Sequence, residues 1–309
     1  MFVRVVVVAL ALFISSAAAA REQLALNPAR AQSAPVTTGV LLLAHGGQPQ
    51  WNAHVSEVAK RVGEKQPTEV AFGMASRASI QAAVDKLTAR GVTSIVAVPL
   101  FVSSHSSVIT STEFLLGLRA EAPADLARFA KMDHGSHGAT DHAQSHADAA
   151  SPVAKTVPVT MTAAFNRHVI IGAIAADRAK SISIEPLNEA VILVAHGPVP
   201  DEDNRRWLDD MSALAEQVRK AAPFANVDYM TVRDDAGPEI REAATRELRA
   251  KVEAQVALGR RVLIVPHLMS FGGIEQGLRK RLAGLDYVMA AQALMPDDRV
   301  VQWVLASVQ

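Results

Sequence analysis

The chain has 309 residues, of which 50% are hydrophobic and 20% are charged, as in an ordinary globular protein with room for two domains. Lys and Arg together number 31, as do Asp and Glu, so the charge balance gives no indication of a nucleic-acid partner. The absence of cysteine excludes disulfides, thiolate metal sites and cysteine nucleophiles. Any bound metal must therefore be held by His, Asp, Glu or Met.

The first residues, 1–31, have the layout of a secretory signal peptide. A basic residue precedes the apolar stretch 5–14, and cleavage motifs of the A-x-A type lie at 18–20 and 29–31. An uncleaved anchor is the alternative, but the apolar stretch is short for a membrane span. We therefore expect an exported or periplasmic protein with a linker at 32–37 and no stable membrane span after cleavage.

Two similar stretches each run from a buried strand into a histidine. Residues 39–44 lead into His45, and residues 190–195 lead into His196. A continuous apolar run that ends at turn residues is typical of a parallel strand buried on both faces. Parallel sheets bind ligands beyond the carboxyl ends of their strands, so both histidines are expected at a functional edge.

Strands and helices alternate through the first half of the chain, residues 38–182. Helical apolar stripes follow the first three expected strands, and this alternation favours a parallel sheet with helices on both faces. The expected strands are 39–44, 69–73, 94–101 and 157–161, and the last helix of this half is expected at 167–180.

The composition changes within this half, between about 123 and 157. This stretch is rich in Ala, Ser, Asp and His, has no apolar period, and is predicted to be an exposed, irregular insertion. Imidazoles and carboxylates so spaced suit the capture of Co²⁺, Ni²⁺ or Zn²⁺, while a chance metal-binding segment without a role is the alternative. The candidate accessory ligands are His134, His137, His142 and His146.

The second half, residues 188–309, repeats the same plan. Strands are expected at 190–195, 225–232, 262–267 and 286–290, with amphipathic helices between them. The predicted fold is α/β, with two similar lobes that arose by internal duplication, each a parallel sheet flanked by helices. Two such lobes facing each other would form a cleft between their strand ends.

His45 and His105 are the main candidates for chemistry, because they follow two different strands of one lobe. Two converging imidazoles can bind a divalent metal while leaving coordination positions open, and can also accept protons near neutral pH. The alternative is that each ring only bonds a neighbouring carbonyl at a tight turn. A histidine phosphatase is disfavoured, because Ala44 and Ala195 stand where that chemistry needs an arginine.

Three features together resemble the class II chelatases of the CbiX/SirB type, the sirohydrochlorin cobaltochelatases and ferrochelatases. They are the strand-His-Gly opening at 39–46, the strand 98–101 followed by Ser104 and His105, and the twofold repeat. The resemblance implies a metal chelatase, a lyase of tetrapyrrole or cobalamin biosynthesis. Its substrates would be sirohydrochlorin or a related tetrapyrrole and a divalent metal, Co²⁺, Ni²⁺ or Fe²⁺, with no organic cofactor.

The resemblance also implies roles for particular residues. His45 and His105 would handle the metal and the pyrrole protons. Sirohydrochlorin is rich in carboxylates, which arginines near the strand ends can bind by charge-assisted hydrogen bonds. The candidates for the substrate-binding wall are Arg77, Arg167, His196 and Arg233.

The sequence also departs from the family pattern. Many members carry a Glu just after the second strand, where this chain has Gly73 and Met74. In the second half the position that matches His105 is Gly272, because His267 lies five residues earlier relative to the shared proline. These departures leave a second hypothesis, a non-catalytic periplasmic carrier of metal or tetrapyrrole on a chelatase fold.

Overall fold

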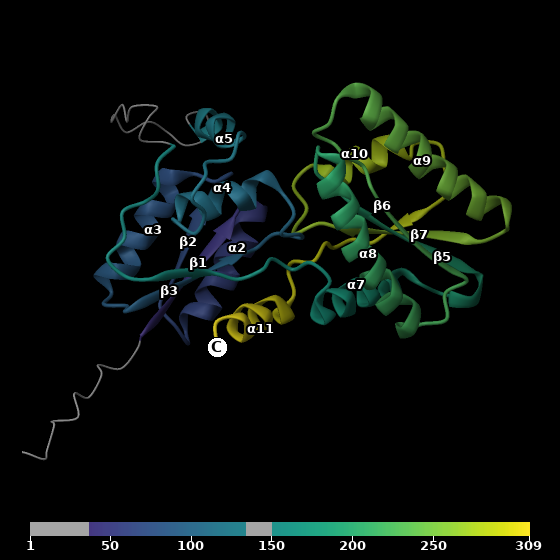
Figure 1. Ribbon diagram of the computed structural model, residues 1–309. Coiled ribbons are helices and arrows are strands. Elements are labelled where there is room, and N and C mark those ends of the chain that lie inside the picture. Colours follow the sequence, from purple (N-terminus) through teal and green to yellow (C-terminus); the bar gives the residue numbers. More distant parts are fainter. Residues whose placement is uncertain (1–36, 134–149) are drawn as a thin grey trace, which may run out of the picture. The chain divides into compact units, whose positions relative to one another are not determined.

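A computed structural model describes the backbone of residues 37–133 and 150–309 (Figure 1). The predicted signal peptide, linker residues 32–36 and the four histidines of the insertion lie outside this part of the chain. Within the described ranges, no helix combines the length and the apolar character that crossing a bilayer requires.

The described chain contains two four-stranded sheets of the same topology. All neighbouring strands run parallel, and each half places its first strand second in the sheet, with orders β2-β1-β3-β4 and β6-β5-β7-β8. The repeated order is what an internal duplication predicts. The strands are β1 (Thr38–Ala44), β2 (Thr68–Phe72), β3 (Ser94–Pro99), β4 (Val159–Met161), β5 (Glu189–Ala195), β6 (Asn226–Thr231), β7 (Arg261–His267) and β8 (Val288–Met289).

The helices lie between these strands, as the apolar periodicity predicts. Several begin with a capping side chain, such as Ser76 before α3 and Ser106 before α4, whose oxygens accept main-chain N–H groups of the first turn. The helices are α2 (Pro49–Gly63), α3 (Arg77–Ala89), α4 (Ser107–Leu115), α5 (Leu126–Asp133), α7 (Val169–Ile182), α8 (Asp201–Ala221), α9 (Pro238–Ala257), α10 (Ile274–Arg281) and α11 (Asp298–Ser307), with a 3-10 turn at Pro186–Asn188.

Side chains alternate between the two faces of each sheet and so supply separate cores. Along β1, Val40 and Leu42 point into one hydrophobic cluster, while Leu41 and Leu43 point into another under α3, α4 and α5. The first of these clusters, here called the inner core, also contains the corresponding face of β5 and residues of α2, α7, α8 and α11. The two halves therefore share one continuous core.

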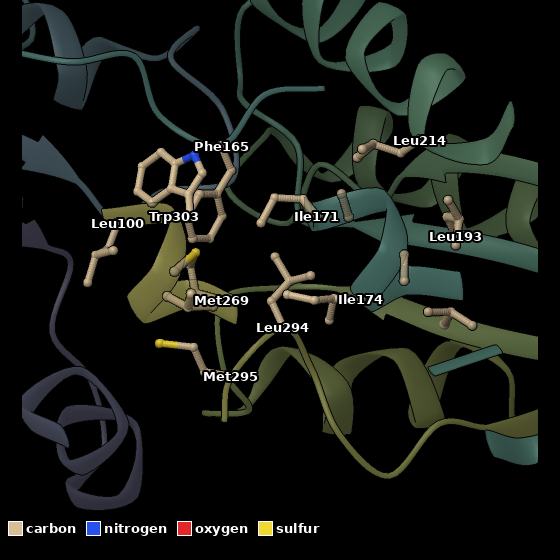
Figure 2. Close-up of a cluster of buried hydrophobic side chains, with 14 of the residues drawn as sticks. Leu100, Phe165, Ile171, Ile174, Leu193, Leu214, Met269, Leu294, Met295 and Trp303 are labelled. Atoms are coloured by element: carbon tan, nitrogen blue, oxygen red, sulfur yellow. The ribbon is translucent and has the colours of Figure 1, made fainter. Parts of the chain in front are cut away.

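Two helices pack away from the sheet that precedes them. The helix α7 follows β4 but packs against α8 and β7, and α11 follows the second sheet but packs against α2 (Figure 1). The rings of Phe165 and Trp303 meet edge to face at this exchange, with centroids 4.4 Å apart (Figure 2). The halves are thus joined by exchanged helices.

The prediction of an exposed, irregular insertion is wrong for residues 126–133, which are helical, whereas residues 150–156 form no helix or strand, as predicted. Residues 126–133 form α5, in which Leu126 and Phe129 are buried, and Val153 on the far side of the insertion is buried too. These three apolar residues pack into the core beneath α3 and α4. A few apolar positions in a polar stretch are easily missed by composition, although the i, i+3 spacing of Leu126 and Phe129 is helical.

Candidate active site at the strand ends

His45 and His105 follow neighbouring strands and therefore reach the same edge of the first sheet. The strands β1 and β3 pair in parallel with Leu43 opposite Pro99, and His45 comes directly after β1. Gly46 then turns the chain with φ of +81°, and Gly197 does the same after His196 with φ of +77°, a conformation that glycine adopts without strain. The duplication thus preserves the turn as well as the histidine.

The imidazole of His45 is exposed, and one of its nitrogens is engaged. Its Nδ1 lies 2.6 Å from the carbonyl oxygen of Gly46. Because a carbonyl oxygen only accepts hydrogen bonds, Nδ1 carries the proton in this contact, and in the neutral ring Nε2 then keeps its lone pair. The ring also lies edge-on to Trp51, with centroids 6.5 Å apart. His45 therefore makes the local carbonyl contact and still offers one nitrogen to a ligand.

The loop that carries His105 is held by its own lobe and by the other one. Within the loop, the main-chain N–H of His105 donates to Ser103 Oγ at 3.1 Å. From the second half of the chain, the indole N–H of Trp207 on α8 donates to the carbonyl of His105 at 2.7 Å. The imidazole itself is 32% exposed. The main chain is therefore fixed while the ring remains accessible.

A buried carboxylate, Asp210 on α8, lies next to His105 and is absent from the predicted site. Its side chain is 6% exposed, Oδ1 accepts a 2.8 Å hydrogen bond from Arg167 Nε, and Oδ2 lies 3.9 Å from His105 Nε2. The sequence does carry a signal: an aspartate interrupts the buried face formed by Trp207, Met211 and Leu214. A charged residue on such a face needs a partner.

The two lobes contact each other in a pseudo-symmetric way around this edge. On α2, Trp51 lies against Gly272, and His54 Nδ1 is 2.7 Å from Ser270 Oγ. On α8, Trp207 and Asp210, which have the same spacing, face the loop of His105. Each helix therefore reaches the loop after the third strand of the opposite lobe, and the edge that holds His45 and His105 borders the second lobe.

The predicted arginines fall into two groups. Arg167 is 60% exposed and bridges to Asp210 beside His105. Arg77 donates instead to the carbonyls of Ser151 and Pro152, at 2.9 and 3.4 Å. Arg233 is largely buried and donates to Pro198, Val199 and Asp201. Their bonds give Arg77 and Arg233 a structural role, and substrate binding by them stays a prediction.

The histidines of the second lobe have different surroundings. His196 Nε2 lies 3.4 Å from Asp235 Oδ2, at the partly exposed end of β5. His267, at the end of β7, is buried, and burial lowers its pKa to about 4. A neutral, buried histidine is what a residue of the core should be. This agrees with the sequence alignment of the two halves, in which Gly272 and not His267 occupies the position of His105.

The position after β2 supplies no carboxylate to the site. Met74, which stands where many class II chelatases have Glu, packs against the core beneath α3. Across residues 37–130 and 150–309, no group of three or more His, Asp or Glu side chains is arranged to hold a metal ion. The residues predicted to handle the metal are thus the pair of histidines alone.

Comparison with known proteins agrees with this architecture. Residues 39–181 match the family model CbiX. SirB from Bacillus subtilis with Fe³⁺ aligns with a TM-score of 0.58 and 17% identity, over 88% of this chain and 94% of that chain. The sirohydrochlorin chelatase SirB from Bacillus subtilis subspecies spizizenii in complex with cobalt aligns over the same shares, with a TM-score of 0.53 and 14% identity. No curated protein matches the chain.

These findings confirm the predicted α/β fold with two similar lobes. The segment that matches the family model runs from β1 into α7, and it contains His45, His105 and the neighbouring strands that bring them together. For residues 39–181, the resemblance to the CbiX family that the sequence indicates is therefore confirmed.

Proposed function

We propose that this protein is an exported class II chelatase that inserts Co²⁺, Ni²⁺ or Fe²⁺ into sirohydrochlorin or a related tetrapyrrole. One observation carries the proposal. Within the segment that matches the CbiX model, two accessible histidines follow adjacent parallel strands. Export rests on the signal-like sequence of residues 1–31, and detection of the shortened protein in a periplasmic fraction would test it.

The arrangement suits transfer of a metal better than its retention. Insertion exchanges two pyrrole N–H protons for one divalent metal ion, so the free tetrapyrrole and M²⁺ give the metallated ring and two H⁺. Two imidazoles bind the ion more weakly than four ring nitrogens, and transfer is therefore downhill. His45 Nε2, whose lone pair is not used by the Gly46 contact, can hold the metal or accept a departing proton.

Arg167 is the best-placed of the predicted arginines for a carboxylate of the tetrapyrrole. Its Nε binds Asp210, yet most of its side chain is exposed next to the loop of His105. A guanidinium has donors in a planar fork, so the terminal nitrogens remain for a second carboxylate. In this role Arg167 would orient the ring over the histidines.

The deciding experiment is a metalation assay on the full-length chain. Sirohydrochlorin is mixed with Co²⁺, Ni²⁺ or Fe²⁺, and the visible spectrum is followed for wild type, His45→Ala and His105→Ala. We expect turnover in wild type and its loss in both variants. His168→Ala is the matched control, because His168 is an exposed cap of α7 outside the site. The absence of turnover with every metal would refute the proposal.

Met74 favours one second candidate, a carrier that binds metal or tetrapyrrole without turnover. Met74 packs against the core, and the site lacks the carboxylate that many family members have there. The carrier hypothesis predicts saturable binding of cobalt or sirohydrochlorin and no metallated product. Removal of residues 134–149 adds a second comparison: retained turnover with weaker metal uptake would assign the predicted accessory histidines to supply of the metal.

A further inference from the structure

One oxygen of Asp210 is buried without a hydrogen bond. The residue is only 4% exposed, and Arg167 satisfies Oδ1, but Oδ2 has no hydrogen-bond partner among the residues that the structure describes. A buried acceptor without a partner is costly, and a buried charge more so. The imidazole of His105 faces this oxygen, with Nε2 at 3.9 Å from Oδ2.

The helix α8 already holds the loop of His105 at a second point. Trp207 donates to the His105 carbonyl at 2.7 Å, and Asp210 lies one turn further along the same helix face. The main chain of His105 therefore faces Trp207, and its imidazole faces Asp210, both on one helix of the opposite lobe. The hydrogen bond to the main chain limits how far the imidazole can move away from the carboxylate.

A separation of 3.9 Å is too long for a hydrogen bond but lies within the range of an ion pair. Hydrogen bonds of active sites are often long in the absence of substrate and shorten in the complex. The ring of His105 is partly exposed and can rotate about its side-chain bonds, whereas Asp210 is enclosed and held by Arg167. Closure of the gap therefore needs movement of the ring only.

We infer that Asp210 is the positioning residue of His105: its Oδ2 accepts the Nε2–H of the imidazole and leaves the Nδ1 lone pair for the ligand. Carboxylates commonly hold the far nitrogen of a metal-binding histidine in this way, which fixes both tautomer and ring orientation. His45 uses the opposite arrangement, with Nδ1 on the Gly46 carbonyl and Nε2 free. That Nδ1 of His105 binds a metal ion rests on the proposed function. The contact between Asp210 and His105 does not depend on that function.

Imidazole ¹⁵N NMR on the full-length chain, without metal or tetrapyrrole, tests the contact directly. We expect His105 in wild type to be the Nε2–H tautomer, and Asp210→Asn to convert it to a mixture. Trp207→Phe removes the hydrogen bond that holds the loop but keeps the carboxylate, so it should shift the tautomer less than Asp210→Asn does. A predominantly Nδ1–H tautomer in wild type would overturn the inference, and this result does not depend on whether Asp210→Asn folds.

Cobalt titration of the same proteins tests the consequence. Loss of a carboxylate behind a metal-binding histidine weakens metal binding by about 10- to 100-fold. We expect such a loss in Asp210→Asn, and no additional loss when Asp210→Asn is combined with His105→Ala. Equal losses in both backgrounds would show that Asp210 acts on folding alone and would contradict the inference.

The two proposals fail in different ways. If no metallated product forms but the tautomer and the coupled cobalt binding are as expected, the chelatase function is lost and the positioning role stands. If wild type metallates sirohydrochlorin while Asp210→Asn shows the wild-type tautomer and cobalt affinity, the positioning role is lost and the chelatase function stands.

Discussion

The indole N–H of Trp207 donates a 2.7 Å hydrogen bond to the main-chain carbonyl of His105, across 102 positions of sequence. The donor belongs to α8 in the second half of the chain, and the acceptor follows β3 in the first. The loop that presents a predicted metal ligand is therefore braced by the opposite lobe. Separation of the lobes would release this loop.

Substitution Trp207→Phe should lower stability and loosen this loop. The change removes one hydrogen bond of a buried side chain, and we expect a loss of about 1 to 2 kcal/mol in the free energy of unfolding beyond the loss of packing. Trp51→Phe is the control, since the structure records no hydrogen bond from its indole to another described residue, and it is equally buried. Urea unfolding measures both, and equal losses would contradict the prediction.

The pair Glu189 and Arg261 should contribute strongly to stability at the start of the second sheet. Glu189 is 1% exposed; burial alone would raise the pKa of its carboxyl, but hydrogen bonds from Ser183, the Ile184 main chain and Arg261 outweigh burial and hold this pKa below its usual value. Arg261→Met leaves a buried charge without its cation, which costs about 3 to 5 kcal/mol.

The matched control for Arg261 is Arg61→Met, which breaks the exposed pair with Asp298 between α2 and α11. Exposed ion pairs contribute little to stability because water screens them, so this variant should unfold close to wild type in guanidinium chloride. A loss as large as that of Arg261→Met would contradict the prediction.

His267 should make the protein less stable in mild acid. Its pKa is about 4 in the folded state, because of burial, and about 6.5 in the unfolded chain. Between these values the unfolded state binds the extra proton, so stability falls as the pH is lowered from about 6.5 to about 4, by an amount on the order of 3 kcal/mol. The control is His267→Leu, whose stability should fall less between pH 6.5 and pH 4. Thermal unfolding at a series of pH values measures both proteins, and parallel curves of stability against pH would refute the prediction.

Gly197 is expected to be the more sensitive of two glycines with similar backbone angles. A Cβ at Gly197 would lie 2.5 Å from Thr231 Cβ, whereas at Gly259, with φ of +73°, it would meet nothing within 4 Å. Gly259→Ala should cost about 1 kcal/mol from backbone strain alone. Gly197→Ala should cost about 1 to 3 kcal/mol more, because Thr231 must shift, and urea unfolding of the two variants would show equal losses if this were wrong.

The sequence by itself determined the repeated strand-His-Gly unit, the order of the elements and the placement of His45 and His105 at strand ends. These features are local, because a buried parallel strand and an amphipathic helix each leave a periodic apolar pattern in the chain. The helix α5 leaves a much weaker pattern, since only Leu126 and Phe129 mark it in a polar stretch, and it was therefore not predicted.

Only the tertiary structure decided which residues surround the histidines. Asp210 reaches His105 because α8 borders the loop after β3 of the other lobe. The guanidinium groups of Arg77 and Arg233 bind carbonyls of loops. Such contacts depend on how the two halves pack through the exchanged helices α7 and α11. That packing follows from the burial of one core shared by both halves. A periodic apolar pattern in the sequence indicates that one face of an element is buried, but it does not indicate which other element covers that face.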